Sequence, residues 1–189
     1  MVPLIQKIAR WLVLCEGPIA KARKWKLRCL GATIGSKTYI PSSFHCTWPH
    51  QIAVGSNCIL QRDIFFNVDK YWTPGPIIRI GDRVFIGKGA EFNITCRLTI
   101  GNDSLIASGV KVIDHDHGML KGDLMRHQPS NEAEVIIGND VWIGANSILL
   151  KGVKISDGAV VGAGSVVTRS IPSYEIWAGI PAKKISERS

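Results

Sequence analysis

The chain has 189 residues, of which 46% are hydrophobic and 20% charged, so it is long enough for one domain with a buried core and is not a disordered chain. Its net charge of +8 favours an anionic partner, but none of the usual nucleic-acid-binding modules is present, so nucleic acid is not expected as that partner. No apolar run reaches the roughly 18 residues that cross a bilayer, and five cysteines without C-x-x-C spacing are typical of reduced thiols in a cytoplasmic protein.

Residues 1–29 are predicted to form one or two helices, with a break at Gly17 and Pro18. One helical face of the first part is apolar and consists of Leu4, Ile8, Trp11, Leu12 and Cys15. No small-residue cleavage site follows the apolar stretch, so a secretory signal is not expected. We favour a helical cap over the open end of a solenoid. The alternative is a basic amphipathic helix in peripheral contact with a membrane or a lipid-linked substrate.

From residue 30 to residue 170, aliphatic residues recur with a period of six. The positions are Ile34, Ile40, Val54, Leu60 and Phe66 in an eroded first part; Ile80, Ile86, Phe92 and Leu98 in a second; Ile100, Ile106 and Val112 after a slip of two residues; and Ile137, Ile143, Leu149, Ile155, Val161 and Val167 in the most regular part. A glycine or another small or polar residue follows most of them. Neither an amphipathic helix nor a long strand has this period. It predicts one short strand and one tight corner per unit, with three units closing a triangular turn of a parallel β-helix.

Three segments depart from the repeat. A loop is expected near residues 67–77, where Tyr71 and Trp72 could stack on a sugar or pack on a neighbouring subunit. A longer polar loop is expected over residues 118–134, directly after Asp114-His115-Asp116-His117. Long excursions from a rigid scaffold commonly carry function. A short tail, residues 171–189, contains the run Ala178-Gly179-Ile180-Pro181-Ala182-Lys183.

The repeat and this tail resemble the hexapeptide-repeat acyltransferases, and within them the sugar O-acetyltransferases that include the galactoside, maltose and surface-polysaccharide acetyltransferases. The resemblance implies a left-handed coil, although crossovers between parallel strands are usually right-handed. It implies transfer of an acetyl group from acetyl-CoA to a hydroxyl of a sugar or lipid-linked saccharide, without a metal. It also implies a homotrimer with active sites between subunits, in which the loop over 118–134 closes the acceptor pocket of a neighbouring subunit.

Acetyl transfer to a hydroxyl requires a general base, and histidine suits this role because its pKa lies near neutrality. The family pattern places the base at His117, and His115 is the alternative. On an extended strand His115 points the same way as His117, where it could support the base or contact the acceptor. Asp114 or Asp116 could orient an imidazole through its second nitrogen, and both are candidates for the acceptor site.

The acceptor site implied by the resemblance includes Glu91 and Asn93. Close sugar acetyltransferases carry Asn-Phe-Asn at this place, and the first Asn helps to hold the acceptor. This chain has Glu91-Phe92-Asn93 instead. The acceptor that the family would imply is therefore in question, and either side chain could simply cover one face of the coil.

The donor site is also implied by the resemblance. Trp142 matches a tryptophan that borders the pantetheine arm of CoA. Ala145 and Ala163 mark small corners where a backbone amide could approach the pantetheine or donate to the oxyanion. The positions near the adenosine end, where basic groups suit phosphates, are Thr168, Arg169 and Lys183, so the tail contributes to the CoA site.

Two other functions are compatible with such a coil. Carbonic anhydrases of the gamma type bind zinc with three histidines shared between subunits, and His115-x-His117 superficially resembles that set. The remaining histidines, however, show no matching spacing; they are His45, His50 and His127. A non-catalytic scaffold is the third possibility, which failure to bind CoA would support.

Overall fold

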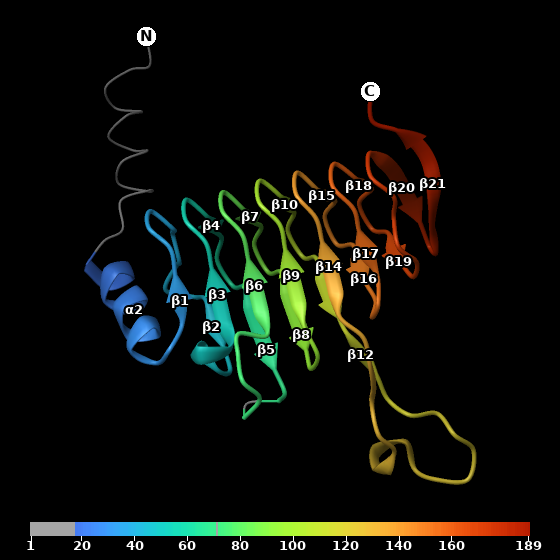
Figure 1. The fold of residues 1–189 in the computed structure, drawn as a ribbon, viewed down its shortest axis with the longest axis horizontal. Helices are drawn as coiled ribbons and strands as arrows, with labels where there is room; N and C mark the ends of the chain where they lie inside the picture. The colour runs from blue at the N-terminus through green and yellow to red at the C-terminus, as the bar shows by residue number, and fades with distance from the viewer. Residues whose placement is uncertain (1–17, 71) are drawn as a thin grey trace.

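The computed structural model describes residues 18–70 and 72–189, which form a three-sided coil of short parallel strands with a helix at its N-terminal end (Figure 1). The coil is a left-handed parallel β-helix, which confirms the predicted fold class. Within the described residues, no helix is long and apolar enough to span a membrane.

Three sheets form the sides of the coil, here called faces A, B and C. Face A contains β1 (Thr33–Ile34), β3 (Ile52–Val54), β6 (Ile78–Ile80), β9 (Leu98–Ile100), β14 (Val135–Ile137) and β17 (Lys154–Ile155). Face B contains β4 (Ile59–Leu60), β7 (Phe85–Ile86), β10 (Leu105–Ile106), β15 (Trp142–Ile143), β18 (Val160–Val161) and β20 (Glu175–Gly179). Face C contains β2 (His45–Cys46), β5 (Phe65–Val68), β8 (Glu91–Ile94), β11 (Lys111–Ile113), β16 (Ile148–Leu149) and β19 (Val166–Val167). The chain passes from A to B to C in each turn, so the three edges are called A–B, B–C and C–A.

The predicted aliphatic positions stack in columns along the inside of the coil, which confirms the six-residue register. In the regular part the stacked pairs are Ile137–Ile155, Ile143–Val161 and Leu149–Val167. All six side chains are buried. On face C the column continues into Phe66 and Phe92, whose rings meet edge to face with centroids 4.9 Å apart. Each strand thus contributes an inward apolar side chain to one continuous core.

The A–B edge is closed by a ladder of polar side chains. Along this edge, an Asp or Asn side chain of one coil accepts a hydrogen bond from the backbone N–H of the preceding coil. The donor and acceptor residues are Ser56 and Asp82 (2.7 Å), Asp82 and Asn102 (2.8 Å), Asn102 and Asn139 (2.9 Å), and Asn139 and Asp157 (2.7 Å). Only small residues fit just before these positions. A Cβ on Gly101, for example, would lie 2.5 Å from the carbonyl carbon of Gly138.

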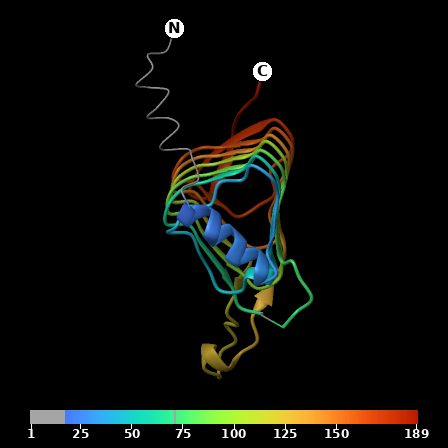
Figure 2. The ribbon, with the colours of Figure 1, turned by 90° about the vertical axis from the view of Figure 1, so that its left-hand side faces the viewer.

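Between β5 and β14, three interruptions of the repeat leave the coil at the C–A edge. Residues 69–77 join β5 to β6, two extra residues lie between β8 and β9, and residues 114–134 join β11 to β14. Figures 1 and 2 show the first and third projecting from the same edge. Because β5 continues through Val68, the first loop starts at Asp69 rather than at residue 67. We call residues 69–77 the loop and residues 117–130 the arm.

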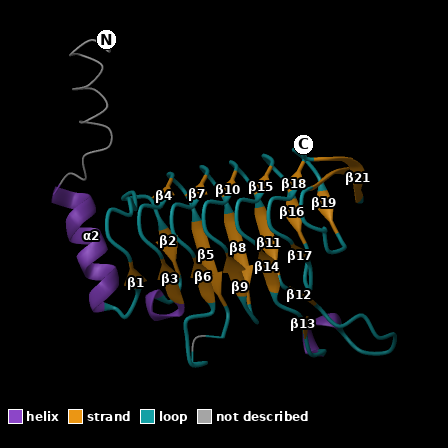
Figure 3. Ribbon diagram, turned by 45° about the horizontal axis from the view of Figure 1, so that its top comes forward, coloured by secondary structure: helices purple, strands orange, loops and turns teal. Residues whose placement is uncertain are grey.

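The third interruption contains more secondary structure than its polar sequence suggests. β12 (His115–Asp116) pairs antiparallel with β13 (Asn131–Glu132), and these two strands form the neck of the arm (Figure 3). The arm also contains a 3-10 turn, Met125–His127. His115 lies opposite Glu132 in this pair. His115 is therefore part of a paired strand, whereas His117 lies just beyond it at the start of the arm.

The N-terminal end of the coil is covered by α2 (Pro18–Cys29), which lies across its opening (Figure 2). Side chains of α2 donate hydrogen bonds to carbonyl oxygens of the first coil: Arg23 to Phe44, Lys24 to Thr38 (3.0 Å) and Arg28 to Ile34 (2.6 Å). Leu27 is buried in the core, and the 3-10 turn Pro49–Gln51 also contacts α2. The apolar face expected for Leu4 to Cys15 lies outside the described residues.

The C-terminal tail is a β-hairpin. β20 continues face B by pairing parallel with β18, and β21 (Ala182–Glu187) pairs antiparallel with β20. The Arg188 guanidinium reaches back to the Asp140 carboxylate, with 2.8 Å between Nη1 and Oδ2. The hairpin therefore extends face B beyond the last coil.

Candidate active site

Asp114 is the structural centre of the C–A edge. Its carboxylate is fully buried and accepts hydrogen bonds from the backbone N–H groups of Thr95 (2.8 Å), Cys96 (2.7 Å) and Arg97 (2.9 Å). These three residues form the corner that contains the two extra residues of the repeat. Asp114 therefore satisfies the donors that the longer corner would leave unpaired. The expectation that Asp114 contacts the acceptor is corrected, because its oxygens lie beneath the surface.

His115 is held in place by Asp114 and Thr95. Its Nδ1 lies 3.1 Å from Asp114 Oδ1 and 3.0 Å from Thr95 Oγ1, and its side chain is 17% exposed. A carboxylate only accepts hydrogen bonds, so we assign the Nδ1 proton to His115 as donor and leave its Nε2 as the basic nitrogen. Of the two aspartates considered for orienting an imidazole, Asp114 is the one whose carboxylate lies beside a histidine ring, that of His115.

His117 has a different environment at the start of the arm. Its side chain is exposed and makes no hydrogen bond or ion pair within the described residues. Asp116, between the two histidines, pairs with Lys151, with 2.6 Å between Oδ2 and Nζ. A general base must be accessible to the substrate and correctly oriented. Here His117 is accessible and His115 is oriented, so each histidine meets one of these two requirements.

Glu91 and Asn93 lie on β8, on the outer side of face C. Glu91 Oε1 accepts a hydrogen bond from Asn93 Nδ2 (2.9 Å), and Glu91 Oε2 lies 2.7 Å from Lys111 Nζ on the adjacent strand β11. The hydrogen bonds from Lys111 and Asn93 lower the pKa of Glu91 from its usual value. The residue that replaces the family's first Asn is therefore half of an ion pair that the sequence did not reveal.

The predicted donor residues lie on face B and the B–C edge. Trp142 is on β15 and points outward, with 53% of its side chain exposed. Ala145 and Ala163 occupy equivalent corner positions in successive coils, where the Gly164 N–H donates to the Ala145 carbonyl oxygen (2.8 Å). Within the described part of the chain, the N–H groups of Ala145 and Ala163 have no hydrogen-bond partner. The B–C edge therefore presents open N–H donors at these corners, whereas polar side chains satisfy the corresponding donors at the A–B edge.

The residues expected near the adenosine end are on the last coil and the hairpin. Thr168 and Arg169 are exposed directly after β19, and Lys183 is exposed on β21. The hairpin is linked to the last B–C corner by a hydrogen bond from the Gly179 N–H to Ser165 Oγ (3.1 Å). These three side chains are therefore free to meet a ligand that follows the C-terminal part of the coil.

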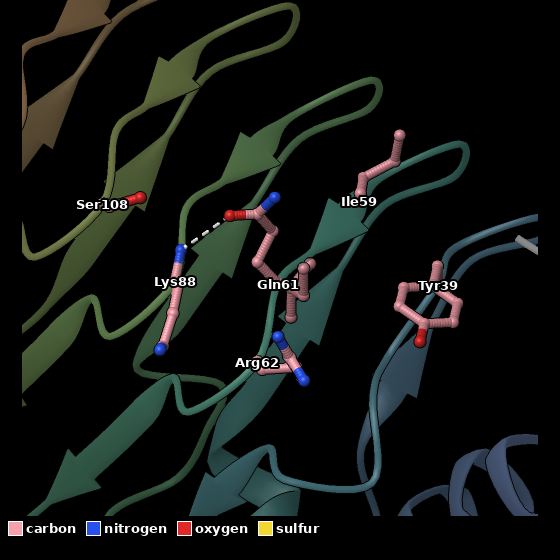
Figure 4. Close-up of a pocket in the computed structure, with 7 residues that line it drawn as sticks. Tyr39, Ile59, Gln61, Arg62, Lys88 and Ser108 are labelled. Atoms are coloured by element: carbon pink, nitrogen blue, oxygen red, sulfur yellow. Dashed lines mark hydrogen bonds between the residues drawn. The ribbon is translucent and has the colours of Figure 1, made fainter. Parts of the chain in front are cut away.

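A cavity of about 670 Å³ lies along the B–C edge in the coils that precede Ala145 and Ala163. Figure 4 shows its lining, which consists of Tyr39, Ile59, Leu60, Gln61, Arg62, Lys88 and Ser108. At this coil a side chain does cap the corner, because Gln61 Oε1 accepts the Lys88 N–H (2.9 Å). None of the predicted site residues lines this cavity, so we do not place the reaction there.

The histidines and the open amides lie at two different edges of one chain. His115 and His117 follow β11 at the C–A edge, whereas Ala145 and Ala163 precede β16 and β19 at the B–C edge. Face C separates the two sets. A single chain thus does not bring its predicted base and its predicted donor wall together.

Four side chains near the site were not predicted as site residues. Thr95 holds His115, and Lys111 pairs with Glu91. Lys70 of the loop pairs with Glu132 of the neck, with 2.6 Å between Nζ and Oε2. The hydrogen bond from Lys70 lowers the pKa of Glu132.

Among the described residues, no group of three or more His, Cys, Asp or Glu side chains could hold a metal ion.

Comparison with known proteins connects this geometry to an enzyme family. The family model described as "Hexapeptide repeat of succinyl-transferase" matches residues 77–113 and 134–169, which are the coils from β6 to β11 and from β14 to β19. The lipopolysaccharide biosynthesis O-acetyltransferase WbbJ of Escherichia coli, whose own assignment is provisional, is 34% identical over 148 residues. That match covers 69% of this chain and 76% of WbbJ.

Two further proteins extend the comparison. The galactoside O-acetyltransferase of Escherichia coli is 34% identical over 136 residues, covering 68% of this chain and 66% of the relative. The N-acyltransferase AntD of Bacillus cereus, in complex with dTDP-4-amino-4,6-dideoxyglucose and coenzyme A, superposes with a TM-score of 0.78 at 22% identity. That superposition covers 88% of this chain and 89% of AntD, and it supports the fold.

Proposed function

This chain belongs to the hexapeptide-repeat acetyltransferases, and we propose that it transfers an acetyl group from acetyl-CoA to a hydroxyl of a sugar or polysaccharide precursor. The observation that carries the proposal is the pairing of two features. Histidines that could act as base stand at the C–A edge, one of them oriented by a buried carboxylate, and small corners with open N–H groups line the B–C edge. Relatives named for O-acetyl transfer to saccharides support a sugar hydroxyl as the acceptor.

His117 is the general base of this proposal. Its exposed imidazole takes the proton of the acceptor hydroxyl while the oxygen attacks the thioester carbonyl carbon. The imidazolium then returns the proton to the CoA thiolate when the C–S bond breaks. His115, with its ring fixed by Asp114 and Thr95, supports the acceptor side of the site. His115 is the alternative base, because its Nε2 remains available for a proton.

The donor is held by the B–C edge and the C-terminal hairpin. The N–H groups of Ala145 and Ala163 donate to the pantetheine amide and to the oxyanion that develops on the thioester oxygen. Trp142 covers the pantetheine arm from face B. The phosphates at the adenosine end meet the exposed side chains of Thr168, Arg169 and Lys183. AntD, with the same fold, binds coenzyme A, which supports CoA as the carrier.

The acceptor lies beside the histidines, with Glu91, Asn93 and Asp116 as its contacts. The Glu91–Lys111 ion pair places a carboxylate and an ammonium where the close sugar acetyltransferases have an amide. Both groups can bond to sugar hydroxyls, but their directions differ from those of an asparagine. Acceptor choice in this chain therefore depends on this pair.

The active enzyme is a homotrimer with each site between two copies. The outward side chains of face B form an apolar stripe whose exposed members include Ile59, Leu105 and Trp142. An exposed apolar surface of this kind is typical of a protein interface. Cyclic assembly would bring the C–A edge of one copy to the B–C edge of the next. This would unite the two sets of residues that one chain keeps apart.

We place the reaction in the cytoplasm, where cysteines are usually kept reduced. The four cysteines in the described residues are free, in keeping with this placement; they are Cys29, Cys46, Cys58 and Cys96. A peripheral contact with a membrane or a lipid-linked acceptor would use α2. Its outer face carries the exposed ammonium groups of Lys21 and Lys26.

The test is acetyl-CoA turnover, followed by release of free thiol in the presence of a panel of saccharide acceptors. We expect thiol release by the wild type and a kcat about 10²- to 10⁴-fold lower for His117→Ala, as is usual when a general base is removed. His115→Ala should lose less. Full activity of His117→Ala with a large loss in His115→Ala would transfer the base to His115. No thiol release by the wild type with any acceptor would favour a non-catalytic scaffold.

A further inference from the structure

The loop over residues 69–77 is anchored on both sides. Gln51, whose side chain is buried beneath the loop, donates from Nε2 to the carbonyl oxygen of Thr73 (2.5 Å). On the other side, Lys70 Nζ lies 2.6 Å from Glu132 Oε2 in the neck of the arm. Two attachments to separate parts of the fold give the loop a defined position beside the C–A edge.

Trp72 lies between these anchors with 85% of its side chain exposed. A surface hollow of about 440 Å³ adjoins it and is lined by Asp69, Lys70, Trp72 and Thr73. An indole ring offers a flat apolar face to the C–H side of a sugar ring. The Asp69 carboxylate accepts hydrogen bonds from hydroxyls, and the Lys70 ammonium donates to ring or hydroxyl oxygens. This combination of an aromatic plane with charged polar groups suits a saccharide.

The hollow is connected to the histidine segment through side-chain contacts. Thr95 Oγ1 lies 3.0 Å from His115 Nδ1 and 3.5 Å from Asp69 Oδ2, so one hydroxyl stands between the hollow and the oriented histidine. Glu132, the partner of Lys70, is opposite His115 in the β12–β13 pair. Figures 1 and 2 show the loop and the arm leaving the same edge of the coil.

From these contacts we propose that the loop forms a saccharide subsite, in which Trp72 stacks on a sugar ring of the acceptor adjacent to the one that is acetylated. The proposal rests on acetyl transfer to a saccharide as the function of the C–A edge. It assigns Trp72 to binding of the acceptor and not to the chemical step. Acceptors with at least two sugar rings should therefore use the subsite more fully than monosaccharides.

Steady-state kinetics of Trp72→Ala tests the subsite. The acceptor KM for a di- or trisaccharide should rise about tenfold, whereas kcat and the KM for acetyl-CoA should stay within about twofold, because stacking outside the reacting ring acts through binding. The matched control is Trp25→Ala, which removes another exposed tryptophan (69%) from α2 and should leave all three constants unchanged. An unchanged acceptor KM in Trp72→Ala, with an active wild type, overturns the subsite and leaves the proposed function standing.

A binding experiment separates the subsite from catalysis. The indole N–H resonance of Trp72, identified by its loss in Trp72→Phe, should shift when maltotriose, lactose or N-acetylglucosamine oligosaccharides are added, and the Trp25 resonance should not. The expected shift would support the subsite even if no thiol release is found. No shift with any of these saccharides overturns it. A lower sedimentation coefficient of Trp72→Ala without a change in saccharide binding also overturns it, because Trp72 would then pack on a neighbouring copy.

Discussion

Asp114 shows how one buried carboxylate can serve both the fold and the site. Three backbone N–H groups of the 95–97 corner donate to it, and His115 Nδ1 lies 3.1 Å from the same group. Hydrogen bonds to an ionised group are stronger than neutral ones, and removing the acceptor leaves buried donors unsatisfied. The orientation of His115 is therefore tied to the stability of the corner.

Asp114→Asn should destabilise the protein by about 3 kcal/mol, because the new NH₂ group would face backbone N–H donors in place of an acceptor. Urea denaturation measures this as a lower midpoint with an unchanged slope. Asp116→Asn is the matched control. It breaks a half-buried surface pair with Lys151 and should change the free energy of unfolding by about 1 kcal/mol or less. Equal midpoints for the two variants would show that the three amide contacts contribute little.

At the scale of single residues, the sequence predicted which side chains gather at the edge but not how they are buried. The run from Asp114 to His117 stood out because it ends the aliphatic register before a long polar segment. Nothing local distinguishes Asp114 from Asp116, yet Asp114 is fully buried and Asp116 is only half-buried. The difference comes from the corner at Thr95, which is distant in sequence. The partners Lys70, Lys111 and Thr95 are equally non-local and could not be paired without the register of the coils.

At the scale of elements, the corners of the coil differ in chemistry. Along the A–B edge, Asp and Asn side chains satisfy the backbone donors of the preceding coil. At the B–C edge, Ala145 and Ala163 have no side chain that could do so, and their N–H groups remain open. The same backbone turn therefore has its N–H groups satisfied by side chains at the A–B edge, whereas at Ala145 and Ala163 the N–H groups remain available to a ligand. The small residues at these corners are a binding feature as well as a steric requirement.

Ala163→Leu should raise the KM for acetyl-CoA by about tenfold or more, because a branched side chain at this exposed corner would cover the open N–H groups. The change should leave the thermal midpoint nearly unaltered, since Ala163 is exposed. Ser36→Leu, at an exposed corner of the A–B edge, is the control and should not alter the KM. An unchanged KM in Ala163→Leu would place the donor elsewhere, for example in the cavity lined by Arg62 and Lys88.

The six-residue period was sufficient to predict the strands and their inward residues, because each side of each coil needs one inward apolar residue and one small residue at a tight corner. It could not predict the neck of the arm or the C-terminal hairpin. β12 and β13 are two residues each and pair antiparallel, so they leave no periodic trace in the sequence. The hairpin of β20 and β21 likewise follows the end of the repeat, and only its parallel pairing with β18 continues the coil.

At the scale of the whole molecule, the two halves of the proposed site stand at different edges of face C. The base belongs to the C–A edge and the donor amides to the B–C edge. The apolar stripe on face B supplies a surface by which copies could associate, and a cyclic arrangement repeats the same contact between each pair. In such an assembly every site takes its histidine from one copy and its donor corner from the next.

Subunit complementation tests this arrangement most directly. His117→Ala and Ala163→Leu are each assayed alone and then after co-refolding in equal amounts. Release of thiol is followed at an acetyl-CoA concentration far below the KM of Ala163→Leu, where that variant alone has little activity. In random mixed trimers, one interface in each mixed assembly combines an intact histidine with an intact donor corner, so about a quarter of the wild-type sites should return. Recovery near that level is expected. Activity no higher than the sum of the two variants assayed apart would contradict an active site built from two copies.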